Sequence, residues 1–417
     1  MQSTSDGTAA AIQAAGGQAH AGPLPLRIVF VDDEPNLLSG LERLLRPQRA
    51  QWSMRFCEGA ESALAALAQE PADVVISDMR MPRMTGGEFL AEVQRRWPAT
   101  MRVILSGQAD LAMIHQTIGP AHQFLRKPCD AGQLKGLIER IWRLRRAIAN
   151  TQVHALVGGM QSLPSLPGLH DELQAALAEP SPSIRRVSEV IARDPGMSAR
   201  VLQLLNSAFF GGSHILADPS EAATRLGVDT LRTLATATNA FSRLETGRQV
   251  WFDPGGMWAH SVRVARLAGR IAEDLALPQQ QVLEAQTAGL LHDTGHMLLA
   301  AHKPKEFVIL ARKVGQEGDV HGERLVLGCT HGEIGAYLLG LWGLPEGVVD
   351  AVAWHHEPGR LAPMQPAVVS CVHIADALDS LQAAGLGGID RLSREHVHAV
   401  GLEDRIDAWR DMVERPV

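Results

Sequence analysis

Residues 26–34 read Leu26-Arg27-Ile28-Val29-Phe30-Val31-Asp32-Asp33-Glu34, an apolar run that passes directly into acidic residues. A second run, Val74-Val75-Ile76-Ser77-Asp78, also ends in a carboxylate. Short β-branched runs of this kind are typical of strands that are buried on both faces of a parallel sheet. Amphipathic stretches with helical spacing separate the runs, so we expect a doubly wound α/β domain with a parallel five-stranded sheet. The other expected strands are Ser53–Cys57, Arg102–Leu105 and Gln123–Leu125, and the expected helices are Asn36–Leu45, Gly59–Gln69 and Gly87–Arg95.

Chemically active side chains stand at the carboxyl ends of these expected strands. Asp32 and Asp33 follow the first strand, Asp78 closes the third, and the fourth and fifth end at Ser106 and Lys127. Because parallel strands place their carboxyl ends at one edge of the sheet, we expect these groups to share a pocket. Clustered carboxylates suit a hard cation such as Mg²⁺, and a carboxylate can itself attack a phosphoryl group. Helix capping, the alternative role, does not explain five such groups at five matching places.

The segment from Leu26 to Leu144 resembles the response-regulator receiver domain, which implies a flavodoxin-like fold. The motifs that carry the resemblance are the acidic pair, Asp78-Met79-Arg80-Met81-Pro82, Gly86, Ser106 and Lys127-Pro128, a pair for which a cis peptide bond is expected. By this resemblance Asp78 accepts the phosphoryl group, and Asp32, Asp33 and Asp78 bind Mg²⁺. Ser106 and Lys127 would then contact the phosphoryl group, and Phe124 would be the switch aromatic. The implied partner is a cognate sensor histidine kinase.

A helical segment from Ala131 to about Ala155 follows, and we assign residues 135–160 to a linker helix. Apolar residues recur in it at alternating spacings of four and three, the pattern of a coiled-coil seam shorter than two heptads. The seam residues are Leu137, Ile141, Leu144 and Ile148. Two interpretations stay open: this face packs on its own domain, or it joins two copies of the chain as a homodimer.

The second half of the chain is rich in histidine and reads as helical beyond a turn-rich boundary at residues 158–168. The whole sequence holds 17 histidines against one tyrosine. Candidate metal ligands recur at intervals of one helix-turn-helix step, and they are His260, His292, Asp293, His331, His355, His356 and Asp376. Imidazole and carboxylate groups from facing helices of a bundle form a borderline metal site, for which Fe, Mn and Zn are all suitable.

Two other interpretations of these histidines exist. His292 and His296 have the spacing of a zinc-peptidase helix, but Gly295 weakens a helix there and Asp293 is one methylene shorter than the usual Glu. The adjacent residues His292 and Asp293 can both ligate one ion only if the helix end opens at Gly295. A purely structural role also stays open, in which the histidines are buried and form hydrogen bonds with backbone carbonyls.

The order His, His-Asp, His, His-His, Asp is similar to that of the HD phosphohydrolase superfamily, and the segment from Leu163 resembles the HDOD domain more closely. The motifs that carry this resemblance are Leu163–Pro167, Ile191–Gly196, Leu205–Phe210 and Ala223–Gly227. The resemblance implies an all-α, HD-like helical bundle that is usually regulatory and binds a protein or nucleotide partner. The alternative is a metal-dependent phosphohydrolase acting on a cyclic dinucleotide. The chain departs from cyclic di-GMP phosphodiesterases at His356-Glu357-Pro358-Gly359, which replaces a Gly-Tyr-Pro element, and at His296, where those enzymes carry a lysine.

The composition bears on nucleic-acid binding, membrane insertion and cellular location. The net charge of −7 gives no basic field for nucleic acid, so nucleic-acid binding is not expected. No apolar run reaches the length of a membrane span, and four scattered cysteines favour a cytoplasmic location. We expect a flexible tail over 1–24, without the features of a signal peptide. The remaining assignments are receiver 25–134, linker 135–160, HDOD domain 161–360, and C-terminal helices 361–417 that either complete the bundle or stand apart.

Overall fold

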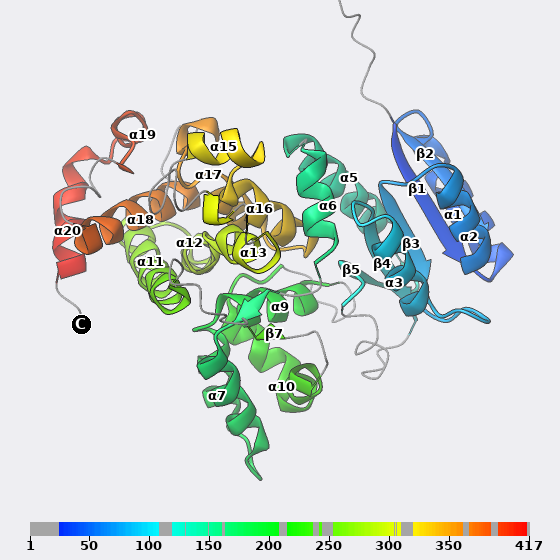
Figure 1. The fold of residues 1–417 in the computed structure, drawn as a ribbon, viewed down its shortest axis with the longest axis horizontal. Helices are drawn as coiled ribbons and strands as arrows, with labels where there is room; N and C mark the ends of the chain where they lie inside the picture. The colour runs from blue at the N-terminus through cyan, green and yellow to red at the C-terminus, as the bar shows by residue number, and fades with distance from the viewer. Residues whose placement is uncertain are drawn as a thin grey trace, which may run out of the picture.

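The structure is a computed structural model. It describes residues 25–107, 119–129, 131–148, 150–160, 163–207, 215–236, 242–243, 253–303, 305, 307–309, 320–361, 367–384 and 391–414. The tail expected over 1–24 lies outside the described residues. An α/β domain stands at one end of the molecule and a helical domain at the other (Figure 1). No helix of the described part of the chain is both long and apolar enough to cross a bilayer.

The α/β domain contains the five-stranded sheet that the sequence predicts. All of its strands are parallel, and their order is β2-β1-β3-β4-β5. The strands β1, β3 and β4 are almost entirely buried, because helices cover both faces of the sheet. The elements are β1 Leu26–Asp32, α1 Pro35–Leu45, β2 Trp52–Glu58, α2 Ala60–Gln69, β3 Val74–Asp78, α3 Gly86–Arg96, β4 Met101–Ser106, β5 Gln123–Arg126 and α5 Ala131–Ala147.

The expected linker helix is divided in two, which corrects the prediction of one continuous helix. The first helix, α5, ends at Ala147, and a new helix, α6 (Thr151–Gly158), begins after Asn150. The Asn150 side chain caps α6 by accepting hydrogen bonds from the N–H groups of Gln152 and Val153. Side-chain capping of this kind satisfies N–H groups that have no partner within the helix, and it starts a helix where asparagine stands.

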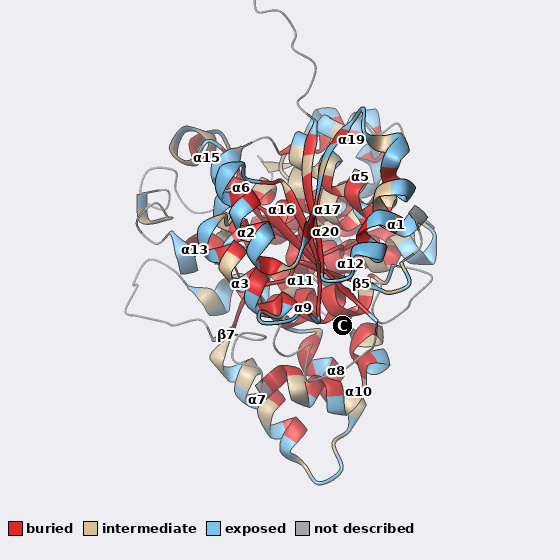
Figure 2. Ribbon diagram, turned by 90° about the vertical axis from the view of Figure 1, so that its right-hand side faces the viewer, coloured by how far each residue is buried: buried red, intermediate tan, exposed pale blue. Residues whose placement is uncertain are grey.

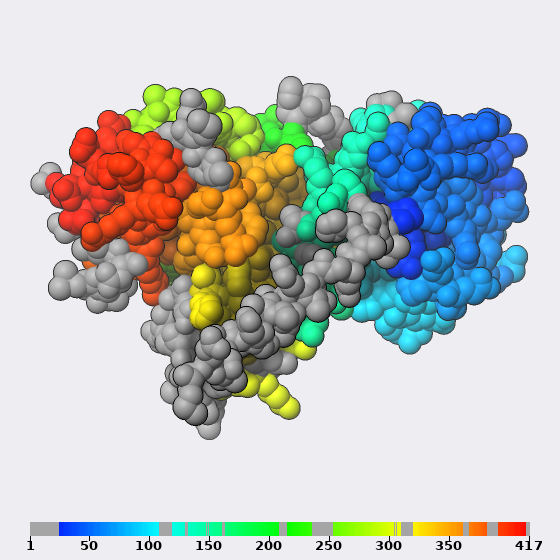
Figure 3. All heavy atoms as spheres, turned by 90° about the horizontal axis from the view of Figure 1, so that it is seen from above, coloured from blue at the N-terminus to red at the C-terminus, as the bar shows by residue number. Residues whose placement is uncertain are grey.

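The apolar seam of α5 is occupied within the chain. Leu137, Ile141 and Ile148 are buried in the common core. Leu144 packs on Gly340 of the helical domain. The blue-green segment that includes α5 and α6 accordingly lies between the receiver and the orange helices (Figure 3). This seam is therefore not free to join two copies of the chain.

The helical domain is a bundle with one short two-stranded parallel ladder, β6 with β7. Buried residues concentrate where α11, α12, α16 and α17 gather (Figure 2). The elements are β6 Pro164–Ser165, α7 Pro167–Ala178, α8 Ile184–Ile191, α9 Pro195–Asn206, α10 Pro219–Thr236, β7 Ser242–Arg243, α11 Pro254–Asp274, α12 Gln279–Leu291, α13 Thr294–His302, α15 Val320–Leu327, α16 His331–Leu341, α17 Glu346–Trp354, α18 Val368–Ala384, α19 Arg394–Ala399 and α20 Ile406–Glu414.

Two of the sequence motifs meet at Asp194, a fully buried carboxylate. It caps α9 through Met197 N–H (2.9 Å) and accepts from Ser165 Oγ (3.0 Å). It also accepts from Leu166 N–H (3.2 Å) and from Trp258 Nε1 (3.1 Å) on α11. One side chain thus ties together three parts of the helical domain.

The C-terminal helices pack on the same bundle. Helix α18 lies against α11, α12 and α17, and α20 packs on α18 and α11. Trp409 of α20 is fully buried and donates its Nε1–H to Asp274 of α11 at 2.8 Å. The helical bundle therefore extends beyond residue 360.

Candidate functional site

The carboxyl edge of the receiver sheet brings Asp32, Asp78 and Lys127 together. Lys127 Nζ lies 2.7 Å from Asp32 Oδ2 and forms an ion pair with Asp78. The Asp78 carboxylate also accepts a 2.6 Å hydrogen bond from the N–H of Arg80. The peptide bond between Lys127 and Pro128 is cis, as the sequence motif predicts. The structure thus joins residues from three strands into one charged pocket.

Other predicted receiver residues lie near this pocket with different exposure. Asp33 follows Asp32 and is exposed, while Ser106 is buried at the end of β4. Phe124 is buried within β5, three residues before Lys127. At Gly86 a Cβ would overlap the carbonyl oxygen of Asp78. Only glycine therefore lets the loop after β3 fold back against the acidic residue.

Burial and ion pairing act in opposite directions on the pKa values of Asp78 and Lys127. Burial raises the pKa of Asp78 above its ordinary value, although Lys127 pulls it down. Burial acts to lower the pKa of Lys127, but hydrogen bonds to Asp32 and Asp78 outweigh it, and the pKa is raised. The ammonium group is therefore held charged between two carboxylates, where a further cation or a phosphoryl group can rearrange the ion pairs.

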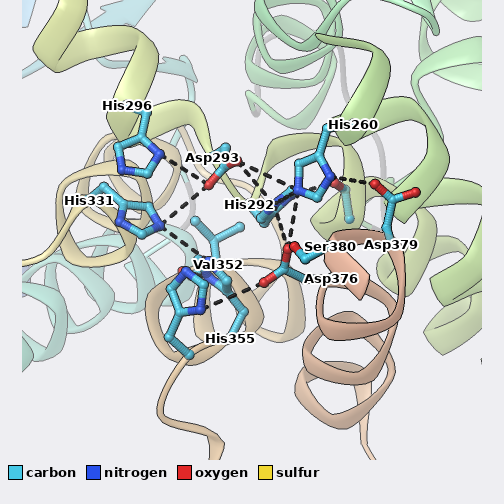
Figure 4. A network of polar contacts seen from close by, with 12 residues as sticks. His260, His292, Asp293, His296, His331, Val352, His355, Asp376, Asp379 and Ser380 are labelled. Atoms are coloured by element: carbon cyan, nitrogen blue, oxygen red, sulfur yellow. Dashed lines mark hydrogen bonds and ion pairs between the residues drawn. The ribbon is translucent and has the colours of Figure 1, made fainter. Parts of the chain in front are cut away.

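The second site is built where helices of the bundle start and end. His260 projects from α11 and Asp376 from α18, while His292 and Asp293 stand between α12 and α13. His331 is the first residue of α16, and His355 and His356 follow α17 directly. The structure brings all seven predicted ligands into one cluster, which we call the histidine–aspartate centre; six of them are buried and His356 is partly exposed. Figure 4 shows how the side chains of His260, His292, Asp293, His331, His355 and Asp376 converge.

The two oxygens of Asp293 face different partners. Oδ2 lies 3.3 Å from His292 Nε2, on the side where His260 Nε2 is 3.1 Å from Asp376 Oδ1. Oδ1 lies 3.4 Å from His331 Nε2 and 3.4 Å from His296 Nδ1. The centre therefore has two neighbouring sets of donor atoms that share one carboxylate.

Four histidines point the same ring nitrogen inward. His260 Nε2 and His292 Nε2 lie 3.2 Å apart, and His331 Nε2 and His355 Nε2 lie 3.3 Å apart. Neither pair can be satisfied by hydrogen bonds if all four rings are neutral and their Nδ1 atoms carry the protons.

The outward nitrogens are held by fixed acceptors. His292 Nδ1 bonds to Gly289 O at 2.8 Å, and His355 Nδ1 bonds to Val352 O at 2.9 Å. Carboxylates hold the other two rings. Asp379 lies 2.7 Å from His260 Nδ1, and Glu323 lies 2.8 Å from His331 Nδ1. Rings oriented in this way, with Nε2 converging, are typical of metal-ligating histidines.

The electrostatics divide the centre. Burial alone would lower the pKa values of His260 and His296. Hydrogen bonds with Asp376 and Asp379 outweigh burial at His260 and raise its pKa to about 11. Hydrogen bonds with Asp293 and Glu323 do the same at His296 and raise its pKa to about 10. By contrast, burial lowers the pKa of His356 to about 3 and that of His355 well below its ordinary value. At neutral pH the centre thus offers neutral imidazoles at His355 and His356, whereas His260 and His296 are cationic beside their carboxylates.

The predicted ligand set omits three members of the site, His296, Glu323 and Asp379, of which His296 was considered only as part of a zinc-peptidase helix and at the position of a phosphodiesterase lysine. His296 stacks on His331 with ring centroids 3.8 Å apart, and Glu323 bonds to both rings. No local pattern marks Glu323, because it reaches the centre from the separate helix α15. Asp379 had a signal, since it lies one helical turn after Asp376 and shares its face of α18.

The helix around His292 also differs from one expectation. Helix α12 ends at Leu291 and α13 begins at Thr294, so the chain opens at Asp293 rather than at Gly295. His292 and His296 consequently face opposite oxygens of Asp293. This is not the single helical face of a zinc peptidase.

Comparisons with known proteins agree with this architecture. The family of the response regulator receiver domain matches residues 28–139, and the family of the HDOD domain matches residues 163–358. The chain is therefore a response regulator. Its output domain is an HDOD domain.

Individual relatives match in part. An uncharacterized protein of Treponema pallidum (strain Nichols) is 26% identical over 220 residues, which is 52% of this chain and 42% of the relative. The hydrogenase transcriptional regulatory protein HoxA of Cupriavidus necator is 35% identical over 103 residues, 24% of this chain and 21% of the relative. The chain thus covers less than half of the length of these curated relatives.

Solved structures are similar over different portions. The MmoQ response regulator from Methylococcus capsulatus has 23% identity and a TM-score of 0.46, covering 60% of this chain and 98% of that one. The signal receiver domain of an HD domain-containing protein from Pseudomonas fluorescens Pf-5 has 29% identity and a TM-score of 0.29, covering 31% of this chain and 95% of that one.

Proposed function

We propose that Asp78 is the phosphoacceptor of this response regulator and that a cognate sensor histidine kinase is its donor. The contact of Lys127 with both Asp32 and Asp78 carries this assignment. Three carboxylates, Asp32, Asp33 and Asp78, are the residues that would hold Mg²⁺, since oxygen ligands at one sheet edge suit that ion. When bound, Mg²⁺ neutralises charge on phosphoryl oxygens.

In the proposed transfer an Asp78 carboxylate oxygen attacks the phosphorus atom of the donor. A new P–O bond forms as the bond from phosphorus to the donor atom breaks, and the donor leaves with that electron pair. Lys127 then shifts from its carboxylate partners toward the phosphoryl oxygens, and the Ser106 hydroxyl donates a hydrogen bond to one of them. Phe124, which is buried in β5 three residues before Lys127, would be the aromatic residue that responds to this change.

Labelling with acetyl phosphate tests the assignment. Wild-type protein is expected to gain one phosphoryl group that is labile to hydroxylamine, and Asp78→Asn is expected to gain none. The control is Asp73→Asn, because Asp73 lies at the opposite end of β3. Labelling that persists in Asp78→Asn would overturn the assignment.

We further propose that the HDOD domain holds a divalent transition metal and signals by binding a protein or nucleotide partner. The converging Nε2 atoms of His260, His292, His331 and His355 support this proposal. Asp293, Asp376 and His356 complete the donor set, and such mixed nitrogen and oxygen donors suit Fe, Mn or Zn. When bound, the metal supplies a Lewis acid.

The alternative output is a metal-dependent phosphohydrolase of the cyclic dinucleotide phosphodiesterase type. The shared carboxylate of Asp293 favours this candidate, since it faces two sets of donors. Incubation of the Mn²⁺-loaded protein with cyclic di-GMP distinguishes the two. Turnover that is lost in His292→Ala would establish the hydrolase, and bound metal without turnover would leave the binding role.

A further inference from the structure

One helix, α16, reaches from the histidine–aspartate centre to the receiver. Its first residue, His331, places Nε2 3.4 Å from Asp293 Oδ1. Its last residue, Leu341, accepts a 2.9 Å hydrogen bond from the side-chain amide of Gln123. At about 1.5 Å per residue the helix spans about 15 Å between these points. It is buried along most of its length, so it can move only as a packed unit.

The receiver end of α16 is in close contact with β5 and α5. Gln123 is the first residue of β5 and is buried, and the same strand leads through Phe124 to Lys127. At Gly340, a Cβ would lie 2.7 Å from Cδ2 of Leu144. Just beyond the helix, a Cβ at Gly343 would overlap the Gln123 amide. At both positions the glycine lets a receiver side chain, Leu144 or Gln123, lie directly against the backbone at this end of α16. A displacement of β5 can therefore act on α16 through Gln123.

The other end of α16 is packed equally tightly against both segments that carry ligands. A Cβ at Gly332 would lie 2.7 Å from Val352 O, in the helix that precedes His355. A Cβ at Gly335 would lie 2.6 Å from Thr294 Oγ1, immediately after Asp293. A small shift of α16 therefore changes the distances between His331 and its neighbours on two sides.

We propose that α16 couples the phosphoryl site of the receiver to the metal affinity of the histidine–aspartate centre. Occupancy of the Asp78 pocket by a phosphoryl mimic shifts β5, moves α16 through Gln123, and alters the position of His331 among the ligands. By linkage, metal bound at the centre changes the affinity of the pocket for the mimic by the same factor. The inference rests on the proposed metal-holding function of that centre.

The test uses the full chain, with beryllofluoride as the phosphoryl mimic and Zn²⁺ as the probe metal, in saturating Mg²⁺. Zn²⁺ affinity is measured by competition with a chromophoric chelator, with and without beryllofluoride. We expect a change of at least about fivefold in the wild type. Gln123→Ala is expected to reduce that change to less than about twofold, because it removes the bond to α16.

The matched control is Arg143→Ala, which removes an exposed contact between the same domains. Arg143 pairs with Glu346 of α17 at 3.3 Å, and both side chains are exposed. This variant is expected to keep the wild-type change. Equal Zn²⁺ affinity with and without beryllofluoride in the wild type would overturn the coupling, as would an undiminished change in Gln123→Ala.

Amide hydrogen exchange separates this result from failure of the proposed metal site. If no Zn²⁺ binds, the metal-holding function is wrong, and exchange across residues 331–341 decides the coupling alone. Beryllofluoride is then expected to alter exchange in α16 of the wild type and of Arg143→Ala, but not of Gln123→Ala. Unchanged exchange in the wild type would refute the role of α16.

Discussion

Glu323 is predicted to control metal affinity without itself being one of the proposed ligands. Its Oε1 lies 2.8 Å from His331 Nδ1 and 3.1 Å from His296 Nε2, and its Oε2 accepts from the N–H of His331 at 2.8 Å. An amide offers only one acceptor oxygen in place of two. In Glu323→Gln the amide oxygen either stays at the Oε1 position, which leaves an NH₂ group facing the N–H of His331, or turns to the Oε2 position, which presents the NH₂ group to both rings. Either arrangement disturbs the contacts that orient His331.

The expected loss of Zn²⁺ affinity depends on how many histidine rings of the site the substituted carboxylate orients. Changing a residue that orients one ligand costs about 10–100-fold in metal affinity. Because Glu323 holds the proposed ligand His331 at both its ring and its backbone N–H, and also holds His296, which stacks on that ring, we expect about 100-fold weaker Zn²⁺ binding, or about 2.8 kcal/mol. The matched control is Asp379→Asn. Asp379 holds the single ring of His260 and is also anchored by Arg263, so a loss of about 10-fold is expected.

Competition with a chromophoric chelator measures both affinities, and circular dichroism checks that each variant is folded. Zn²⁺ affinity of folded Glu323→Gln within about twofold of the wild type would refute the reasoning. A larger loss in Asp379→Asn than in Glu323→Gln would refute it as well, since the order of the two losses depends on how many rings each carboxylate holds.

Three further predictions concern stability and packing. Asp194→Ala leaves four donors, three of them buried, without their acceptor. It is expected to lower the free energy of unfolding by at least about 4 kcal/mol in urea titrations, with a smaller loss in Asp194→Asn; equal stability to the wild type would contradict this. Gly295→Ala is expected to weaken both folding and Zn²⁺ binding, because the added Cβ would overlap the His331 carbonyl. Gly359→Ala should change neither, because a Cβ at that position faces open space. Equal effects of the two substitutions would contradict the packing argument. Burial and Glu346 raise the pKa of Asp350 from 3.8 to about 6, so the wild type loses stability as the pH rises through that window. Asp350→Asn should therefore be more stable than the wild type in urea at pH 8 but not at pH 4, and a difference independent of pH would exclude this cause.

The receiver could be predicted from the sequence because its information is local. Each strand is a short apolar run, and the reactive group follows at its end, so sheet topology alone gathers Asp32, Asp78 and Lys127. The orientation of these groups is a different matter. The direct contact of Lys127 with both carboxylates depends on the positions of three strands, and no single segment encodes it.

The histidine–aspartate centre was predictable in membership but not in organisation. The seven ligand candidates were visible because histidine is concentrated in one region and recurs once per helix. Glu323 could not be predicted, since nothing in the sequence around it marks a site. It contacts His296 and His331 only because α15 packs beside them. The division between α5 and α6 was also missed, because the apolar spacing continues up to Ile148, just before Asn150 caps the start of a new helix.

Elemental analysis of the full chain, purified without chelator, tests the central claim about the output domain most directly. The proposed function predicts stoichiometric Fe, Mn or Zn in the wild type and its loss in folded His292→Ala and Asp293→Ala. Phosphoacceptor variant Asp78→Asn should keep the metal. A wild-type protein that carries no transition metal, and takes none up on dialysis against Zn²⁺ or Mn²⁺, would contradict the claim and leave the histidines as core residues.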